Sequence, residues 1–486
     1  MHLRVLDLTD FRSYEHVTLQ LRPGVTVFVG SNGQGKTNLV EAVWYLAALS
    51  SHRVSHDAAM VRRGAETAII RAGFVRAGRD VRVDAQLAPG RGTTIRLNGQ
   101  GLSRPREVLG QVRAVLFSPE DLALIKGDPE GRRRFLDEIL YEIAPRFASI
   151  RADFDRVLKQ RNSLLKQMRQ MRRAAARTGG SSGHGSGRSS AGRGRGQRPS
   201  AAPLPDGTDP AEAAQTTLQV WDEQLARTGA ELIRARLHLV NRLRPHVGYS
   251  YMRVATDEGA EVGLQLHPAD RGAVATPANI RYTSSVLEGE LQAASGPVGP
   301  DSPEAAEDPE VARAEKRNAG SDPPLPTLQQ LHDALLEQLT ARHDDEIDRG
   351  ITLSGPHRDD MEIRLHDFPA KGYASHGESW SLALALRLGS YDLLTIEEGD
   401  LGDGEPILIL DDVFSELDQH RRERLGRIIA GAEQVLITTA NDSDIPRSVA
   451  DGSAGELTLV DVTKGRAEIR GGTSGSGRPG GAGGGR

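Results

Sequence analysis

Eight consecutive residues near the start of the chain have the types and spacing of a phosphate-binding loop. They read Gly30-Ser31-Asn32-Gly33-Gln34-Gly35-Lys36-Thr37 and fit the pattern G-x-x-x-x-G-K-[ST]. Glycines let successive backbone N–H groups turn toward phosphate oxygens, and the N-terminus of a following helix adds partial positive charge. We expect Lys36 to reach the β- and γ-phosphates of ATP and the Thr37 hydroxyl to ligate Mg²⁺.

The segments on both sides of this loop must position it. Residues 25–29 are mostly apolar and predict a buried strand, and residues 38–50 predict a helix with an apolar face. A chance glycine turn ahead of a basic helix is the plain alternative. The strand and the helix together favour the phosphate loop, because that motif requires both.

Two residues late in the chain could supply the carboxylates for Mg²⁺ and for the attacking water, which the phosphate loop itself does not contain. The apolar residues 407–410 run directly into Asp411 and Asp412. A buried strand of this kind delivers one carboxylate to Mg²⁺, and a neighbouring carboxylate can hold and deprotonate the attacking water. We assign Asp411 to the metal, and Asp412 with Lys36 to catalysis. Taken alone, a strand that ends in two solvated aspartates is at least as common, so the assignment depends on the pairing with the loop.

Lys36 and Asp411 are 375 residues apart, far more than one compact nucleotide domain needs. We therefore predict an α/β fold: an ABC-type ATPase head with a mixed β-sheet core, interrupted by an inserted helical arm domain. The head halves are predicted at 1–130 and 350–470, the arm at 131–349 and a disordered Gly-rich tail at 471–486.

Hydrophobic periodicity predicts the elements of these parts. Strands are predicted at 3–8, 17–21, 68–75, 81–87, 93–97, 112–117, 361–365, 407–410, 434–438, 457–462 and 467–469, with weaker candidates at 249–255, 262–267 and 280–283. Helices are predicted at 132–170, from about 210 to 243, and at 328–348, 378–394 and 419–431.

The arm is basic and is interrupted by low-complexity sequence. Between residues 132 and 177 there are 13 Lys and Arg against 5 Asp and Glu. A solvated helix explains this excess, and so does a surface for DNA or an acidic partner. The segments at about 174–215 and 293–326 offer little to bury and are predicted to be disordered insertions.

Composition narrows the class of protein further. Hydrophobic residues make up 38% and aromatic residues 4% of the 486 residues, which indicates elongated or disordered parts. The absence of cysteine excludes disulfides and thiolate metal sites and fits a reducing cytoplasm. The N-terminal residues have no signal-type apolar core, and no stretch approaches the roughly 20 apolar residues of a membrane span. We expect a cytoplasmic protein that does not contact membranes.

A serine before the helix at 378–394 has two explanations. Ser375 and Gly377 resemble the S-x-G signature loop of ABC-type ATPases, in which the serine and a helix N-terminus contact the γ-phosphate of ATP held by the other subunit. Ser375 with Glu378 three residues on also fits a capping box, an ordinary helix start. Both can hold at once.

The chain resembles the RecF family of ABC/SMC-like ATPases. Most of the resemblance lies in two stretches, Pro119 to Asp137 and Leu410 to Asp418, the second followed by Arg421 and Leu425. Residues 8–14 and 355–360 are also similar to that family. The resemblance covers roughly 1–170 and 327–465 and fails over the two insertions and the tail.

This resemblance implies a head-and-arm molecule of DNA replication, DNA repair and the SOS response. It would form an ATP-dependent homodimer, bind single- and double-stranded DNA at gaps, and help load RecA with RecR and RecO. Gly30 to Thr37 would be the phosphate loop, and Ser375 and Gly377 the signature for the ATP of the other subunit. Asp411 would hold magnesium, Asp412 would act in hydrolysis, and 415–418 would meet the other subunit.

Two departures from ABC proteins in general suggest slow turnover. Those proteins usually have Glu after the metal Asp and often a His after the next strand, where this chain has Asp412 and Thr438-Thr439-Ala440. A shorter base without a His partner positions water less well. We expect a weak ATPase whose nucleotide acts as a switch.

Three other classes compete with this interpretation. An SMC-type structural DNA-bridging ATPase is the main alternative, but the predicted helix at 132–170 is only about 58 Å long, far short of a coiled-coil rod. A transporter ATPase would need its motifs closer together and a surface for membrane helices. A small-molecule kinase would not need Ser375 or the loop at Ser415.

Overall fold

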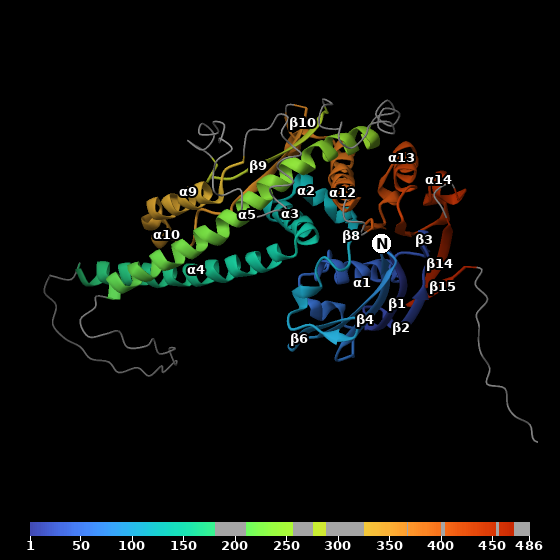
Figure 1. The fold of residues 1–486 in the computed structure, drawn as a ribbon, viewed down its shortest axis with the longest axis horizontal. Coiled ribbons are helices and arrows are strands. Elements are labelled where there is room, and N and C mark those ends of the chain that lie inside the picture. Colours follow the sequence, from blue (N-terminus) through green and yellow to red (C-terminus); the bar gives the residue numbers. More distant parts are fainter. Residues whose placement is uncertain are drawn as a thin grey trace, which may run out of the picture.

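The computed structural model describes residues 1–179, 210–255, 276–287, 325–366, 368–399, 404–452 and 456–470. In it an α/β head, built from both ends of the chain, carries a projecting helical arm (Figure 1). The predicted strand at 262–267, the core of the first insertion, most of the second and the tail lie outside the described residues.

A six-stranded sheet joins the two ends of the chain. Its order is β15-β14-β3-β13-β12-β8, with all neighbours parallel except the β14–β15 hairpin. The N-terminal strand β3 therefore lies between two C-terminal strands. Every residue of β12 and β13 is buried, as expected for parallel strands covered on both faces. The strands are β3 (Gly24–Val29), β8 (Ala114–Phe117), β12 (Ile407–Asp411), β13 (Gln434–Thr439), β14 (Leu457–Thr463) and β15 (Arg466–Ile469).

A second, antiparallel sheet covers the helix that follows the phosphate loop. Its order is β2-β1-β4-β5-β6-β7. Helix α1 (Lys36–Ala48) shares one hydrophobic core with side chains of both sheets, and the predicted apolar face of Leu39, Val43 and Leu46 is buried there. The strands are β1 (His2–Phe11), β2 (Tyr14–Gln20), β4 (Ala68–Arg76), β5 (Arg79–Ala88), β6 (Gly92–Leu97) and β7 (Gln100–Gly101).

Long helices form the arm, and α4 and α5 lie side by side in it (Figure 1). A small sheet of order β11-β10-β9 and helix α12 connect the arm to the head. The elements are α3 (Pro129–Ile143), α4 (Arg146–Gly179), α5 (Pro210–Ala255), β9 (Ala278–Thr283), α9 (Leu328–Ala341), α10 (His343–Arg349), β10 (Asp360–Leu365), β11 (Phe368–Pro369) and α12 (His376–Gly399). Shorter helices are α2 (Leu122–Lys126), α11 (Ala370–Tyr373), α13 (Gln419–Ile429) and α14 (Arg447–Ala450).

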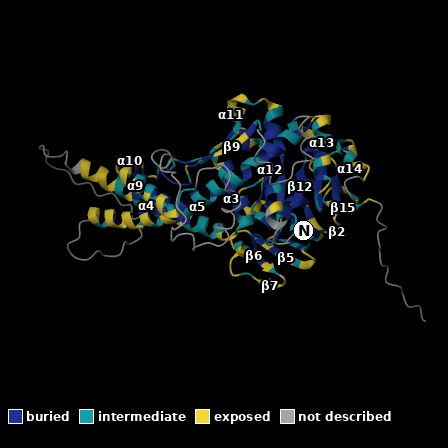
Figure 2. Cartoon of the chain, turned by 45° about the horizontal axis from the view of Figure 1, so that its top comes forward, coloured by how far each residue is buried: buried dark blue, intermediate teal, exposed yellow. Residues whose placement is uncertain are grey.

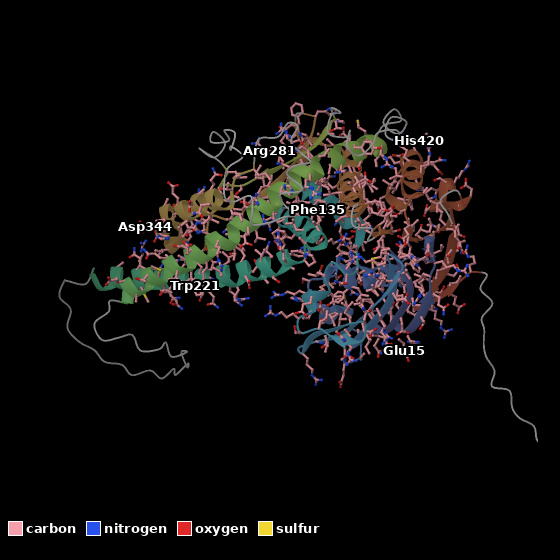
Figure 3. The ribbon with its side chains drawn as sticks, viewed as in Figure 1. Glu15, Phe135, Trp221, Arg281, Asp344 and His420 are labelled. Carbon is pink, nitrogen blue, oxygen red and sulfur yellow. The ribbon has the colours of Figure 1, made fainter. Side chains whose placement is uncertain are left out.

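Burial falls off along the arm. Figure 2 shows buried residues concentrated in the head and exposed residues toward the far end of the arm. Phe135 of α3 lies where arm and head meet (Figure 3) and is 1% exposed. The guanidinium of Arg387 from α12 lies 5.1 Å from the centre of its ring. This cation–π contact, in a buried setting, ties the two parts together.

The structure corrects three predicted elements. The single helix predicted at 132–170 is two helices, because Ala144 before Pro145 adopts an extended conformation. The helix predicted at 328–348 is likewise divided, at Arg342, between α9 and α10. The strand candidate at 249–255 is wrong: these residues form the last turns of α5, where the hydrophobic core, rather than the β-preference of their aromatic side chains, decides the conformation.

The first insertion is also shorter than predicted. Residues 174–179 continue α4, and residues 210–215 belong to α5. The weak strand candidate at 280–283 is confirmed as part of β9, which pairs antiparallel with β10.

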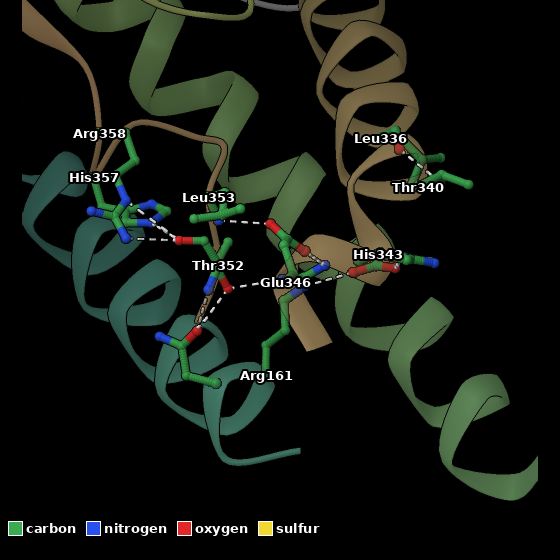
Figure 4. A network of polar contacts seen from close by, with 11 residues as sticks. Arg161, Leu336, Thr340, His343, Glu346, Thr352, Leu353, His357 and Arg358 are labelled. Atoms are coloured by element: carbon green, nitrogen blue, oxygen red, sulfur yellow. Dashed lines mark hydrogen bonds and ion pairs between the residues drawn. The ribbon is translucent and has the colours of Figure 1, made fainter. Parts of the chain in front are cut away.

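A buried charge network holds the arm helices together (Figure 4). Arg161 of α4 is fully buried, and its Nε donates to Asp222 Oδ1 of α5 at 2.6 Å. Its second terminal nitrogen lies 2.7 Å from Glu346 Oε2 of α10, and its first donates to Thr352 Oγ1 at 2.9 Å. One arginine thus neutralises two buried carboxylates from two other helices.

Replacing Arg161 with Met is expected to lower the free energy of unfolding by about 3–5 kcal/mol, because two buried carboxylates lose their counter-charge. Urea denaturation followed by helical circular dichroism measures the loss. Arg172→Met is the matched control on the same helix, since Arg172 pairs with two exposed aspartates and its loss should leave the midpoint unchanged. Equal midpoints for the two variants would contradict this account of the arm.

Candidate functional site

The loop between β3 and α1 has the backbone of a phosphate cradle. Gly33 and Gly35 have φ values of +80° and +115°, a region that favours glycine. Gly35 is also the N-cap of α1 and brings no capping side chain, so the first-turn N–H groups remain suited to an anion. At position 30 there is no space for a side chain, because a Cβ there would lie 2.2 Å from the carbonyl oxygen of Val462 in β14.

Lys36 lies folded over this loop. Its Nζ donates to the carbonyl oxygens of Gly30 at 2.5 Å and Ser31 at 3.3 Å, and to Asn32 Oδ1 at 3.4 Å. Burial lowers the pKa of Lys36, and the charges of Asp412 and Asp411 oppose that shift. The ammonium group is therefore held beside the cradle by weak acceptors that phosphate oxygens can replace.

Asp411 joins the two predicted half-sites. Its Oδ1 accepts a hydrogen bond from Thr37 Oγ1 at 2.9 Å, although Thr37 lies 374 residues earlier. The same oxygen accepts from Thr438 Oγ1 at 2.6 Å. The prediction that the loop and the late carboxylates come together is thus matched by direct contact.

Asp412 lies in an unusual conformation beside Asp411. Its φ is +54°, and its backbone N–H donates to Thr438 Oγ1 at 2.9 Å. Burial raises the pKa of Asp412, and the charge of Asp411 adds to the rise while Lys36 opposes it. Its Oδ1 is buried and has no hydrogen-bond partner among the described residues. A carboxylate in a strained backbone conformation, with one oxygen unpartnered among the described residues and a phosphate cradle beside it, suits a group that acts on a bound ligand.

The sequence interpretation missed two residues of this site. Thr438 orients both aspartates, yet the sequence drew attention to it only as the place where a histidine was lacking. His52, from the segment after α1, places its Nε2 3.4 Å from Asp411 Oδ2. No motif marks His52, and only the folded chain shows where it lies.

Other elements support the loop from outside. The hydroxyl of Tyr14 donates to the carbonyl oxygen of Gly35 at 3.1 Å. The turn between β14 and β15 donates to Gln34 twice, from Lys464 N to Oε1 at 2.7 Å and from Gly465 N to the backbone oxygen at 3.2 Å. Strands from both ends of the chain thus hold the cradle in shape.

Ser375 and Gly377 do not join this cluster. Ser375 is exposed and forms the expected capping box: its Oγ accepts from Glu378 N at 3.3 Å, and its N–H donates to Glu378 Oε2 at 2.8 Å. Gly377 faces Arg421 of α13. Within the described part of the chain, no hydrogen bond or ion pair links either residue to residues 30–37. Among the described residues, the predicted signature therefore contacts its own helix and α13 rather than the phosphate loop.

The oxygen donors around Asp411 fit magnesium. The Thr37 hydroxyl and the carboxylates of Asp411 and Asp412 are the hard ligands that Mg²⁺ prefers. The described residues contain no group of three or more His, Cys, Asp or Glu side chains arranged to hold a metal. Mg²⁺ in ATP sites is usually bound through one or two carboxylates together with substrate phosphates.

In the described residues, none of the helices combines the length and the apolar character that a membrane crossing requires.

Comparison with known proteins identifies a family. The model of the RecF/RecN/SMC N terminal domain matches residues 2–451. A DNA replication and repair protein RecF from Beutenbergia cavernae is 45% identical over 464 residues, covering 95% of this chain and 100% of that protein. One from Paenarthrobacter aurescens is 45% identical over 453 residues, covering 93% of this chain and 96% of that protein.

Solved structures agree on the fold. The recombination mediator protein RecF-ATPrS in the RecFOR pathway is 21% identical to this chain, with a TM-score of 0.69 over 96% of this chain and 98% of that one. The RecF-ATP structure from the same pathway is 22% identical, with a TM-score of 0.68 over 96% and 97%.

The close approach at Gly30 makes it a sharp test of the loop geometry. Gly30→Ala is expected to weaken ATP binding about tenfold or more, because the new methyl group would overlap the backbone of β14. Gly101→Ala is the matched control: a Cβ there meets nothing within 4 Å, its φ is not positive, and it lies in β7 outside the phosphate loop, so ATP affinity should remain that of the wild type. Titration with a fluorescent ATP analogue measures both, and equal affinities for the two variants would contradict the assigned geometry.

Proposed function

The chain belongs to the family of RecF DNA replication and repair proteins, and from this premise we propose that its ATP site works as a switch that controls dimerisation and DNA binding. The observation that supports the proposal most is the hydrogen bond from Thr37 to Asp411, because it brings the carboxylate proposed to hold the metal into contact with the phosphate loop. The relatives named above favour this function over that of an SMC-type structural DNA-bridging ATPase.

The residues of the site have separate roles toward ATP. The loop Gly30 to Thr37 wraps the phosphates, and Lys36 exchanges its present backbone acceptors for β- and γ-phosphate oxygens. Thr37 and Asp411 hold Mg²⁺, which neutralises charge on those oxygens when it is bound. Asp412, whose Oδ1 has no hydrogen-bond partner among the described residues, orients the attacking water and accepts its proton.

We infer that hydrolysis is slow. Asp412 is one methylene shorter than the glutamate usual in ABC proteins, so it holds water less closely to the γ-phosphate. A long-lived ATP state suits a switch, because a ligand that binds one assembly state preferentially shifts the population toward that state.

The exposed Ser375 supports a site completed by a second copy. In an ATP-bound homodimer, Ser375 and Gly377 of each copy contact the γ-phosphate held by the other, with the capping box keeping the start of α12 in place. The same serine thus serves as helix cap and as ligand, as the sequence left open.

The remaining proposals concern partners. Solved relatives belong to the RecFOR pathway, so RecO and RecR are the proposed loading factors, and loading of RecA onto gapped DNA is the proposed outcome, in the cytoplasm. The arm is the proposed contact for single- and double-stranded DNA. Lys159, Lys166 and Arg173 of α4 are exposed and spaced seven residues apart, so they form one stripe on the helix.

The shared site predicts complementation between two defective variants. Lys36→Ala should not bind ATP, and Ser375→Arg should bind ATP but fail to seal it in another copy; each alone should remain monomeric with ATP. Mixed together they rebuild one complete site, from the loop of the Ser375 variant and the Ser375 of the Lys36 variant, and should dimerise. Sedimentation velocity with and without ATP measures this. A Lys36→Ala protein that still dimerised with ATP would disprove the switch.

The basic stripe predicts a salt-dependent change in DNA affinity. Changing Lys159, Lys166 and Arg173 to Ala should weaken binding to a gapped duplex and reduce the slope of log K against log salt by up to about 3, since each lost phosphate contact removes about 0.9. Lys159→Arg with Lys166→Arg keeps the charge and should keep the slope. Fluorescence anisotropy at several salt concentrations measures it, and an unchanged slope in the Ala variant would place DNA elsewhere.

A further inference from the structure

A histidine of the site has no role in the mechanism so far. The side chain of His52 is 8% exposed, and its Nε2 lies 3.4 Å from Asp411 Oδ2. Among the described residues, neither ring nitrogen has a hydrogen-bond partner. Buried polar groups in folded proteins are normally paired, and the exceptions concentrate where a ligand is still to be bound.

The segment that carries His52 is fastened in place. On one side of the ring, the Ser51 hydroxyl donates to Glu41 Oε1 at 2.5 Å and accepts from the backbone N–H groups of Arg53 at 3.0 Å and Val54 at 3.2 Å. Glu41 is fully buried in α1 and is held by two hydrogen bonds from Arg12, at 2.8 and 2.5 Å. This buried ion pair fixes the turn, and with it the ring, against the end of β12.

The two oxygens of Asp411 have different partners. Oδ1 receives the hydroxyl protons of Thr37 and Thr438, whereas Oδ2 faces only the imidazole among the polar contacts of the described residues. A carboxylate that holds a metal must be kept in one orientation, and groups that hydrogen-bond to metal ligands set that orientation. His52 is placed to fix the orientation of Asp411 through Oδ2, the oxygen to which neither threonine donates.

We propose that His52 is a positioning residue of the magnesium site, donating from Nε2–H to Asp411 Oδ2. The contact of 3.4 Å would need to shorten only slightly to become a hydrogen bond in the ATP-bound site, and catalytic hydrogen bonds are often longer before the ligand binds. This inference rests on the proposed function, because it requires that Thr37 and Asp411 hold the Mg²⁺ of bound ATP.

Two substitutions of similar size distinguish the roles of the two ring nitrogens of His52. The amide nitrogen of His52→Gln reaches the position of Nε2, whereas that of His52→Asn reaches only that of Nδ1. ATP binding to the full-length protein is measured by calorimetry in EDTA and at increasing Mg²⁺, and Mn²⁺ is followed by electron paramagnetic resonance. His56→Asn is the matched control, since His56 lies four residues on and is exposed.

We expect His52→Asn to raise the Mg²⁺ concentration that gives half of the maximal gain in ATP affinity about 10- to 100-fold. This is the range for residues that orient metal ligands. His52→Gln should remain within about threefold of the wild type, as should His56→Asn. ATP affinity in EDTA should be the same in all four proteins, and the signal of bound Mn²⁺ should change only in His52→Asn.

Several results would overturn the inference. The first is an unchanged Mg²⁺ requirement in His52→Asn, and the second is equal behaviour of the Asn and Gln variants. The third is a loss of ATP affinity by His52→Asn that is as large in EDTA as with Mg²⁺, because such a loss would mean that His52 only supports the fold of the site. A wild-type protein that binds ATP without any help from Mg²⁺ would remove the proposed function itself. If ATP binding by the wild type depends on Mg²⁺ and His52→Asn leaves that dependence unchanged, the inference fails and the proposed function stands.

Discussion

The short contacts at Asp411 Oδ1 are the constraint on which the rest of the structure depends. This oxygen receives Thr37 from the first strand–helix unit and Thr438 from the last, and the two threonines lie on opposite sides of the arm in sequence. The contacts exist only because β3 lies between β14 and β13, and β13 in turn lies next to β12. A head assembled from either half alone would have a sheet edge in place of a site.

Several contacts far from the site also join the N-terminal part of the head to its C-terminal part. The N-terminal ammonium of Met1 pairs with Glu433, and Leu3 exchanges backbone hydrogen bonds with the side chain of Gln434. On the arm side, Arg236 of α5 makes two hydrogen bonds of 2.8 Å to Asp137 of α3. The arm and the closed sheet are therefore held by separate sets of polar contacts, and the helices α3, α5 and α12 join them through apolar packing and through the contacts of Arg387 with Phe135 and Glu138.

Local sequence patterns predicted most of the head. The phosphate loop, its strand and helix, and the run into Asp411 follow from a motif and from continuous apolar stretches, which depend little on distant residues. The arm was predicted less well, because Pro145 divides a regular seven-residue rhythm and because core packing at the end of α5 outweighs the β-preference of Tyr249 and Tyr251. His52 was not predictable at all, since a lone histidine in a turn acquires meaning only through the residues folded around it.

The chain has no cysteine, so two single substitutions offer the most direct test of a site shared between copies. Ser31→Cys in one population places a thiol on the phosphate loop, and Ser375→Cys in another places one at the signature, both at exposed serines. The two proteins are mixed and treated with a short bismaleimide, with and without ATP. The account predicts a covalent dimer of the two variants that forms with ATP and not without it. Cross-linking that is equal in both conditions, or absent from both, would contradict it.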